Sequence, residues 1–177
     1  EIVLLDMGIN SSDIEKCQDI PHLRIEKVTP VSHVELVREP SKQYANTEYI
    51  MFLDPDEILP QQLTDALLKE YESYDVIKIP RKNIIMTKWI EHARWWPDYQ
   101  VRLFKKDSTT WPTEIHKQPK THGTELVIEA QEELAIVHHN YNSLDEFLGK
   151  MLRYAKAEAT TKYEKHEEYT LALALKD

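Results

Sequence analysis

Short apolar runs alternate with helical patterns along the first half of this chain, and this alternation restricts its fold more than any other feature. Residues 2–5, 49–53 and 76–79 are apolar runs of strand length. Residues 33–40 and 60–71 carry patterns typical of helices. Strands that alternate with helices predict an α/β fold, with a mostly parallel sheet flanked by helices.

A long helix is predicted near the C-terminus. Ser143 and Glu146 form a capping-box pattern, and apolar residues recur at helical spacing from Leu144 to Ala155. Its charges are of both signs, which is typical of a solvated face. The segment 80–123 holds all four tryptophans and predicts strand pieces and long loops, where functional groups concentrate.

The composition bounds the domain count and the partners. The 177 residues suit a single domain over residues 1–177. A net charge of −9 argues against a nucleic-acid partner, because phosphate backbones bind basic faces. The single cysteine, Cys17, permits no internal disulfide, and no apolar run approaches the roughly 20 residues that span a bilayer. We therefore expect a cytoplasmic protein without a transmembrane segment, which can still act peripherally at a membrane.

The apolar run at 49–53 is followed directly by three acids, Asp54, Asp56 and Glu57. In an open α/β sheet this end of a strand faces the ligand crevice. Strand alternation would point Asp54 and Asp56 the same way, so that both can bind one Mn²⁺ or Mg²⁺ ion. Such a cation can bridge the phosphates of a nucleotide-diphosphate leaving group. Alternatively, the acids only stabilise the N-terminus of the helix that starts near Pro60.

Several segments resemble family 2 glycosyltransferases, which have the GT-A nucleotide-sugar-binding fold. The sequence LDPDE at 53–57 is similar to the metal-binding Asp-x-Asp element of that family. Residues 1–12 resemble its second strand and the turn that follows, and residues 34–38 resemble the segment before the acidic strand. Residues 95–104 resemble its WWPDxxxRLF block, and residues 138–144 its H-x-x-Y-x-S element. The matches keep the family's order over nearly the whole chain.

The resemblance implies a metal-dependent, inverting transfer of a sugar from a nucleotide-diphosphate sugar to a glycan, lipid or protein acceptor. It implies that Asp6 contacts the nucleotide base or ribose, and that Arg38 contacts the diphosphate. The family normally has another strand and helix ahead of the segment at 1–12, so we expect an N-terminally shortened domain. Lys117 stands where some relatives have an acid, so no acidic role is implied there.

An inverting transfer needs a base that accepts the proton of the acceptor hydroxyl. Asp98 is the first candidate, from its place in the WWPD block, and a turn residue after Pro97 is the alternative. Glu114 and His116 are the next candidates. The resemblance matches His116 to a family histidine that follows a tryptophan, whereas a hydrogen-bonded structural histidine is the alternative.

Four further residues are candidates for binding. Arg102 can hold a phosphate through two parallel hydrogen bonds, or be a solvated residue on the outer face. His138 can be a third metal ligand, or a strand-end residue bonded to backbone. One of Trp95 and Trp96 is expected to line the acceptor site, because aromatic faces pack well against sugar rings.

Two other functions compete with sugar transfer. A non-catalytic module that binds a sugar or nucleotide is favoured by the missing first strand of the resemblance. An aspartyl phosphatase also places Asp-x-Asp at a strand end. Ile58 and a total of only 3 glycines fit the phosphatase class poorly.

Overall fold

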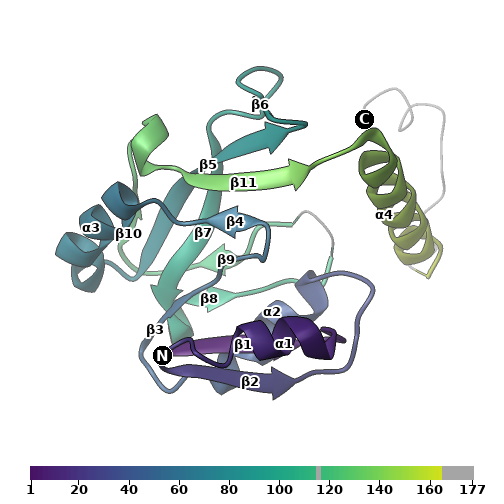
Figure 1. Ribbon diagram of the computed structural model, residues 1–177. Coiled ribbons are helices and arrows are strands. Elements are labelled where there is room, and N and C mark those ends of the chain that lie inside the picture. Colours follow the sequence, from purple (N-terminus) through teal and green to yellow (C-terminus); the bar gives the residue numbers. More distant parts are fainter. Residues whose placement is uncertain (115–116, 165–177) are drawn as a thin grey trace.

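Strand β5 (Val76–Ile85) is the middle of a seven-stranded sheet in the computed structural model, which describes residues 1–114 and 117–164. The strand order is β3-β7-β5-β11-β4, and β6 and β10 also pair with β5 (Figure 1). The bounds are β3 Tyr49–Met51, β4 Glu57–Ile58, β6 Lys88–Trp89, β7 Asp98–Lys105, β10 Glu125–Val127 and β11 Ile136–Tyr141. The chain is a mixed α/β protein, as the alternation of patterns predicts.

The sheet is mixed, whereas the sequence predicts a mostly parallel one. Strand β5 pairs in parallel with β10 and β11 but antiparallel with β6 and β7. The pairs β3–β7 and β4–β11 are also antiparallel. No helix separates β5 from β7 along the described chain, and a parallel neighbour needs a long crossover that is usually a helix. The tryptophan-rich segment therefore returns beside β5 in the antiparallel direction.

Two short strand pairs lie outside this sheet. Strands β1 (Ile2–Asp6) and β2 (Leu23–Lys27) pair in parallel, and α1 (Ser11–Lys16) connects them. Strand β1 lies at the apolar run of residues 2–5, as predicted, whereas β2 was not predicted from the sequence. Strands β8 (Thr109–Thr110) and β9 (Lys120–Thr121) form an antiparallel pair.

The helices follow the predicted patterns closely. Helix α2 (Glu35–Ser41) begins within the first pattern and ends one residue beyond Pro40, whereas the helix was expected to end at or before that proline. Helix α3 (Gln61–Glu70) begins directly after Pro60. Four short 3-10 segments cover Lys42–Tyr44, Tyr71–Ser73, Lys106–Ser108 and Glu132–Leu134.

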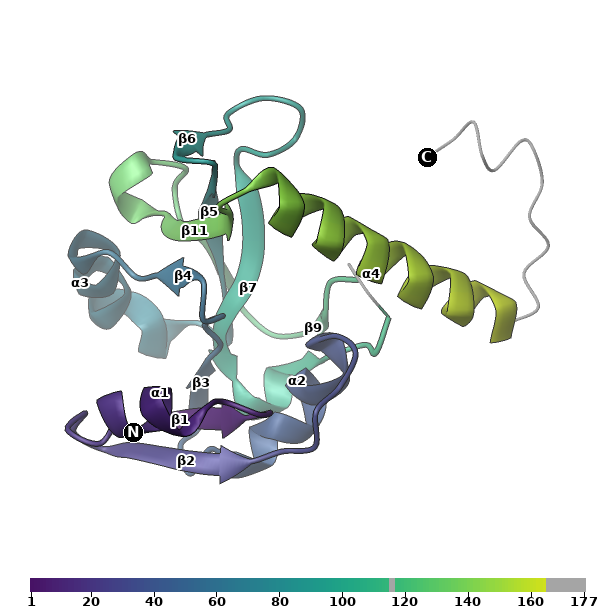
Figure 2. The same cartoon turned by 45° about the vertical axis from the view of Figure 1, so that its right-hand side comes forward.

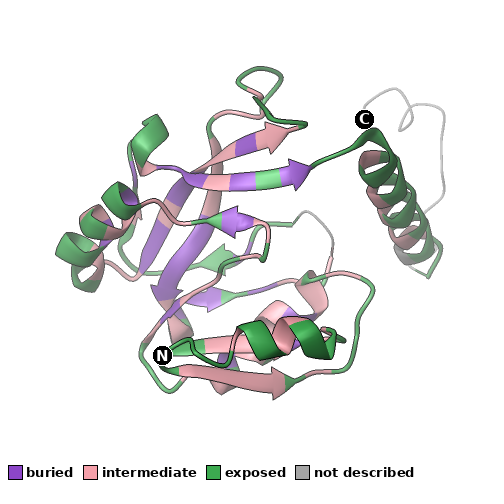
Figure 3. Ribbon diagram, viewed as in Figure 1, coloured by how far each residue is buried: buried purple, intermediate pink, exposed green. Residues whose placement is uncertain are grey.

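The core forms where α3 packs on the central sheet. Leu63 and Leu67 of α3 join a buried cluster with Ile77 and Ile79 of β5 and Ile136 of β11. Alternation along β5 places Ile77 and Ile79 on one face. A second buried cluster contains residues from β3, β5, β7 and the segment after β8, namely Ile50, Val76, Val101, Phe104 and Trp111. Buried residues concentrate on the central strands β5, β7 and β11 (Figure 3).

Helix α4 (Leu144–Glu164) is the long C-terminal helix that the sequence predicts. The backbone N–H of Glu146 donates to Ser143 Oγ at 3.1 Å, so Ser143 caps the helix as expected. The helix continues from the end of β11 and extends along one side of the molecule (Figure 1 and Figure 2). None of the helices in the described residues is both long enough and apolar enough to cross a membrane.

Leu63→Ala is expected to lower the free energy of unfolding by about 2–5 kcal/mol, because Leu63 is fully buried and truncation leaves a cavity. The matched control is Leu68→Ala on the same helix, where the leucine is 67% exposed and the loss should be within about 0.5 kcal/mol. Urea denaturation followed by circular dichroism measures both. Equal losses in the two variants would contradict the packing of α3.

Candidate metal and diphosphate site

The acidic segment after β3 folds into a turn that leads into β4. The backbone N–H of Glu57 donates to Asp54 O at 2.9 Å, and the N–H of Asp54 donates to Glu57 Oε2 at 3.0 Å. The alternation expected for a strand therefore does not apply to Asp54 and Asp56. The Asp54 and Asp56 side chains have different partners, although both residues follow β3 as predicted.

Arg102 of β7 lies at the centre of a charged cluster. Its Nη2 donates to Asp54 Oδ2 at 2.7 Å and also to Glu57 Oε1. The side chains of Arg102 and Glu57 are 1% and 0% exposed, so Arg102 is not a solvated residue. Burial acts to lower the pKa of Arg102, but the charges of Asp54 and Glu57 outweigh burial and raise it overall. Arg102 is therefore a permanent buried cation held between two carboxylates.

Arg38 connects α2 to the same aspartate. Its Nη2 lies 3.1 Å from Asp54 Oδ2 and 3.2 Å from Oδ1. The guanidinium also lies 4.9 Å from the ring centroid of Trp111, in a cation–π contact. Burial acts to raise the pKa of Asp54, but Arg102 and Arg38 lower it more, so the pKa is below its ordinary value. Asp54 is thus an ionised carboxylate bound by two guanidinium groups.

Asp56 faces His138 of β11 and Lys150 of α4 instead. Its Oδ2 lies 3.4 Å from His138 Nε2 and 3.9 Å from Lys150 Nζ. Burial acts to raise the pKa of Asp56, but its neighbours His138 and Lys150 lower it more. The Asp56 side chain is 35% exposed, compared with 24% for Asp54. Asp56 is therefore the acid of the turn that is most accessible to a ligand.

Asp98 pairs with Arg81, which lies directly opposite it on β5. Arg81 Nη2 and Nε donate to Asp98 Oδ2 at 2.7 and 2.9 Å, and Gln100 Nε2 donates to Oδ1 at 2.7 Å. Arg81 Nη1 also donates to Glu57 Oε1 at 3.2 Å, which joins this pair to Arg102. Burial acts to raise the pKa of Asp98, but Arg81 and the hydrogen bonds lower it more. Asp98 is consequently a weak proton acceptor near neutral pH.

Asn83 connects Asp98 to His138. Its Nδ2 donates to Asp98 Oδ2 at 3.1 Å and to Trp95 O at 3.2 Å, while its Oδ1 lies 2.6 Å from His138 Nδ1. Asn83 and His138 are register partners on β5 and β11. Cross-strand pairing on the sheet, together with the turn before β4, therefore assembles the cluster.

Two other predicted site residues have local partners. Asp6 Oδ1 accepts hydrogen bonds from the N–H groups of Gly8 at 2.8 Å and Ile9 at 2.7 Å, and these bonds lower the pKa of Asp6. Glu114 lies 3.2 Å from Lys117 Nζ. His116 lies outside the described residues.

The two candidate acceptor tryptophans differ in their surroundings. Trp95 is partly buried and its carbonyl receives the hydrogen bond from Asn83. The Trp96 ring packs edge-on against Trp89, with 5.1 Å between ring centroids. The acceptor role of either residue stays a prediction.

Sequence reasoning missed Arg81 and Asn83 and assigned Lys150 to a solvated face. Arg81 and Asn83 are two residues apart in β5, so alternation places them on the same face. A polar pair at this spacing within an apolar strand was the available signal. For Lys150 the sequence holds no such signal, because its contact with Asp56 depends on the direction in which α4 continues from β11.

The donors at Asp56 and His138 fit a divalent cation that also binds substrate phosphate. Within residues 1–114 and 117–164, no group of three or more His, Cys, Asp or Glu side chains is placed to hold a metal. Asp56 Oδ2 and His138 Nε2 are 3.4 Å apart, which suits two ligands each about 2.1 Å from one ion. Mg²⁺ is usually held by few protein ligands, with water and substrate phosphates completing its shell.

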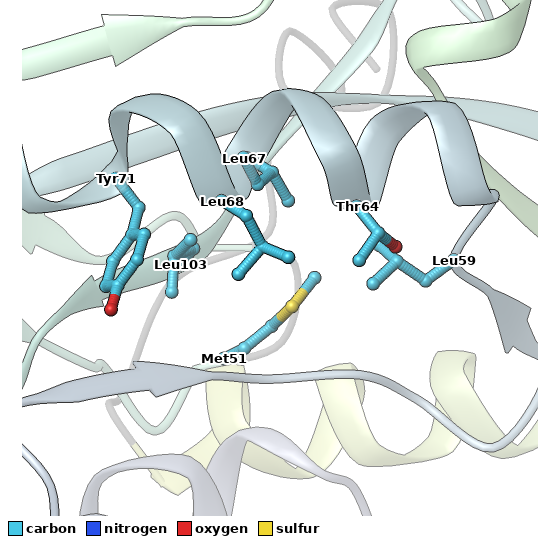
Figure 4. A pocket seen from close by; sticks show the side chains of 7 residues that line it. All are labelled: Met51, Leu59, Thr64, Leu67, Leu68, Tyr71 and Leu103. Carbon is cyan, nitrogen blue, oxygen red and sulfur yellow. The ribbon is translucent and has the colours of Figure 1, made fainter.

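A hollow of about 170 Å³ lies elsewhere, between α3 and the sheet (Figure 4). Its lining residues are Met51, Leu59, Thr64, Leu67, Leu68, Tyr71 and Leu103. Since these include no charged side chain, the hollow has nothing to bind a diphosphate. The charged cluster is therefore the better candidate site.

No model of a known protein family matches this chain. The functional argument accordingly depends on the cluster itself. That cluster combines two metal donors, the partly exposed Asp56 and the buried His138, with buried and half-buried cations next to them.

Arg102→Leu is expected to lower the free energy of unfolding by about 3–5 kcal/mol, because it removes the buried central cation and leaves Asp54 only Arg38 and Glu57 only Arg81. Urea denaturation measures the loss. Arg153→Leu on the exposed side of α4 is the control and should change stability by less than about 0.5 kcal/mol. A stable Arg102→Leu protein would show that the buried ion pairs are not needed.

Stability should fall in acid. The pKa values of Asp54 and Asp98 are lowered in the folded state, so their contribution is present above the unfolded pKa of about 3.9. It is lost as pH falls through the folded pKa values. Thermal unfolding from pH 7 to pH 2 should show this loss, and Asp98→Asn should reduce it, whereas Asp65→Asn on the surface of α3 should not. An unchanged pH profile in Asp98→Asn would contradict the pairing with Arg81.

Proposed function

We propose that this chain binds a nucleotide-diphosphate sugar together with a divalent cation and transfers the sugar to an acceptor hydroxyl. The observation that carries the proposal is the pair of donor atoms on Asp56 and His138, 3.4 Å apart at the end of the turn. Lys150 lies 3.9 Å from Asp56, and Arg38 lies on the adjacent Asp54. Cationic side chains around this pair of metal donors suit a diphosphate leaving group.

Each residue has a distinct part in this proposal. Mn²⁺ or Mg²⁺ held by Asp56 and His138 would neutralise the charge that develops on the leaving diphosphate. Asp54 binds Arg38 and Arg102 and so holds the Arg38 side chain, which is 12% exposed, at the same turn. Lys150 and Arg38 would then bind phosphate oxygens from two sides.

The architecture supports the proposal in outline. We propose that the mixed sheet is a GT-A-like sheet into which β7 returns in the antiparallel direction. The parallel pairs β1–β2 and β5–β11 support that assignment. A glycan, lipid or protein hydroxyl would be the acceptor, next to Trp95 and Trp96, in a reaction at the cytoplasmic side.

A second candidate is binding of the nucleotide sugar without transfer. It is favoured by Asp98, the first candidate base, because Arg81 and Gln100 occupy its oxygens and its pKa is lowered. An aspartyl phosphatase is less well supported. Its nucleophile would be Asp54, which Arg38 and Arg102 already bind.

Titration with UDP-glucose and GDP-mannose, with and without Mn²⁺, should reveal binding that requires the metal. Asp56→Asn and His138→Gln should each weaken this binding about 10-fold or more, because each removes one of two protein donors. Isothermal titration calorimetry measures the affinity. Asp65→Asn and His139→Gln are matched controls, since both residues are exposed, and should bind like the unmodified chain.

Three outcomes separate the candidate functions. Metal-dependent binding with release of nucleoside diphosphate to an acceptor supports transfer. Metal-dependent binding without release supports the binding module. Binding that ignores Mn²⁺, no binding, or release of phosphate from a simple ester would refute the proposed transferase.

A further inference from the structure

The orientation of the buried Asn83 side-chain amide follows from its partners. One end of the amide lies 3.1 Å from Asp98 Oδ2 and 3.2 Å from Trp95 O. An ionised carboxylate and a carbonyl only accept hydrogen bonds, so this end is the Nδ2 amino group. The other end is Oδ1, which only accepts, and it lies 2.6 Å from His138 Nδ1. The hydrogen in that bond must therefore be on His138 Nδ1.

This assignment determines what His138 presents to Asp56. In the neutral form of the ring, a hydrogen on Nδ1 leaves the lone pair on Nε2. Nε2 faces Asp56 Oδ2 at 3.4 Å, and both atoms are then acceptors. A charge-assisted bond from an imidazolium to a carboxylate would be about 2.7–2.9 Å long. The longer separation agrees with two lone pairs that need a cation, or a water molecule, between them.

We propose that Asn83 is a positioning residue, which fixes the His138 tautomer that offers Nε2, together with Asp56 Oδ2, as ligands for a divalent cation. The inference depends on the proposed function, which supplies the identity of the bound cation. Metal-binding histidines commonly donate their other ring N–H to an oxygen acceptor, and this contact sets the direction of the ligand nitrogen. Asn83 Oδ1 is such an acceptor.

The same contacts extend the role to Asp98. Arg81 binds Asp98, Asp98 accepts from Asn83 Nδ2, and Asn83 accepts from His138. Asp98 therefore acts on the metal site by holding the amide in one orientation. Because Trp95 O binds the same amino group, the tryptophan loop is coupled to the orientation of His138.

The tautomer can be observed without metal or substrate. The chain is labelled with ¹⁵N-histidine and measured in EDTA at about pH 9, well above the ordinary histidine pKa of about 6.5, by two-bond ¹H–¹⁵N NMR. His138→Gln identifies the signals. We expect the Nδ1–H tautomer in the unmodified chain and in Asn83→Asp, which keeps an acceptor oxygen. We expect the Nε2–H tautomer to appear in Asn83→Leu, and no change in Asn46→Leu at the surface.

Mn²⁺ affinity, measured by calorimetry on the same proteins, should fall about 10–100-fold in Asn83→Leu and less in Asn83→Asp. An Nε2–H tautomer or an imidazolium in the unmodified chain would overturn the role of Asn83, even if Asn83→Leu does not fold. An unchanged tautomer in folded Asn83→Leu would do the same. The wrong tautomer with intact Mn²⁺ binding refutes the role of Asn83 alone, whereas no Mn²⁺ binding to the unmodified chain refutes the proposed function together with this role.

Discussion

The buried ion pairs of Arg102 with Asp54 and Glu57 are the interaction on which the rest of the site depends. Charges taken out of water cost several kcal/mol each unless they are paired. The cluster meets this requirement with equal numbers of each sign. Its cations are Arg38, Arg81 and Arg102, and its carboxylates are Asp54, Glu57 and Asp98. One neutral network thus joins α2, the turn before β4, β5 and β7.

This pairing separates the acids of the turn by role. Asp54 and Glu57 neutralise arginines and hold the turn on the sheet, whereas Asp56 faces His138 and Lys150 at its more exposed side. A site is more precise when rigid elements hold its ligands. The network supplies that rigidity, because β11 carries His138 and pairs with β4 at Glu57, one residue after Asp56. Asp54 and Glu57 therefore hold the turn in the position from which Asp56 can bind a cation.

The sequence predicts the parts of the fold that local patterns determine. Helices α3 and α4 and the acids at a strand end were predicted from spacing and capping residues. The β5–β6 turn was not, because Met86 and Thr87 take positive φ values of 47° and 72° without the glycine or asparagine that usually marks such a turn. The pairing of Asn83 with His138, 55 residues apart, depends on strand register, which no short-range pattern specifies.

The most direct measurement is the location of Mn²⁺ in crystals of the chain grown with manganese and a nucleoside diphosphate, by anomalous diffraction. The account predicts one peak about 2.1 Å from both Asp56 Oδ2 and His138 Nε2, with Asp54 still bound to its two arginines. A peak on other residues, or an empty site with His138 hydrogen-bonded directly to Asp56, would contradict it.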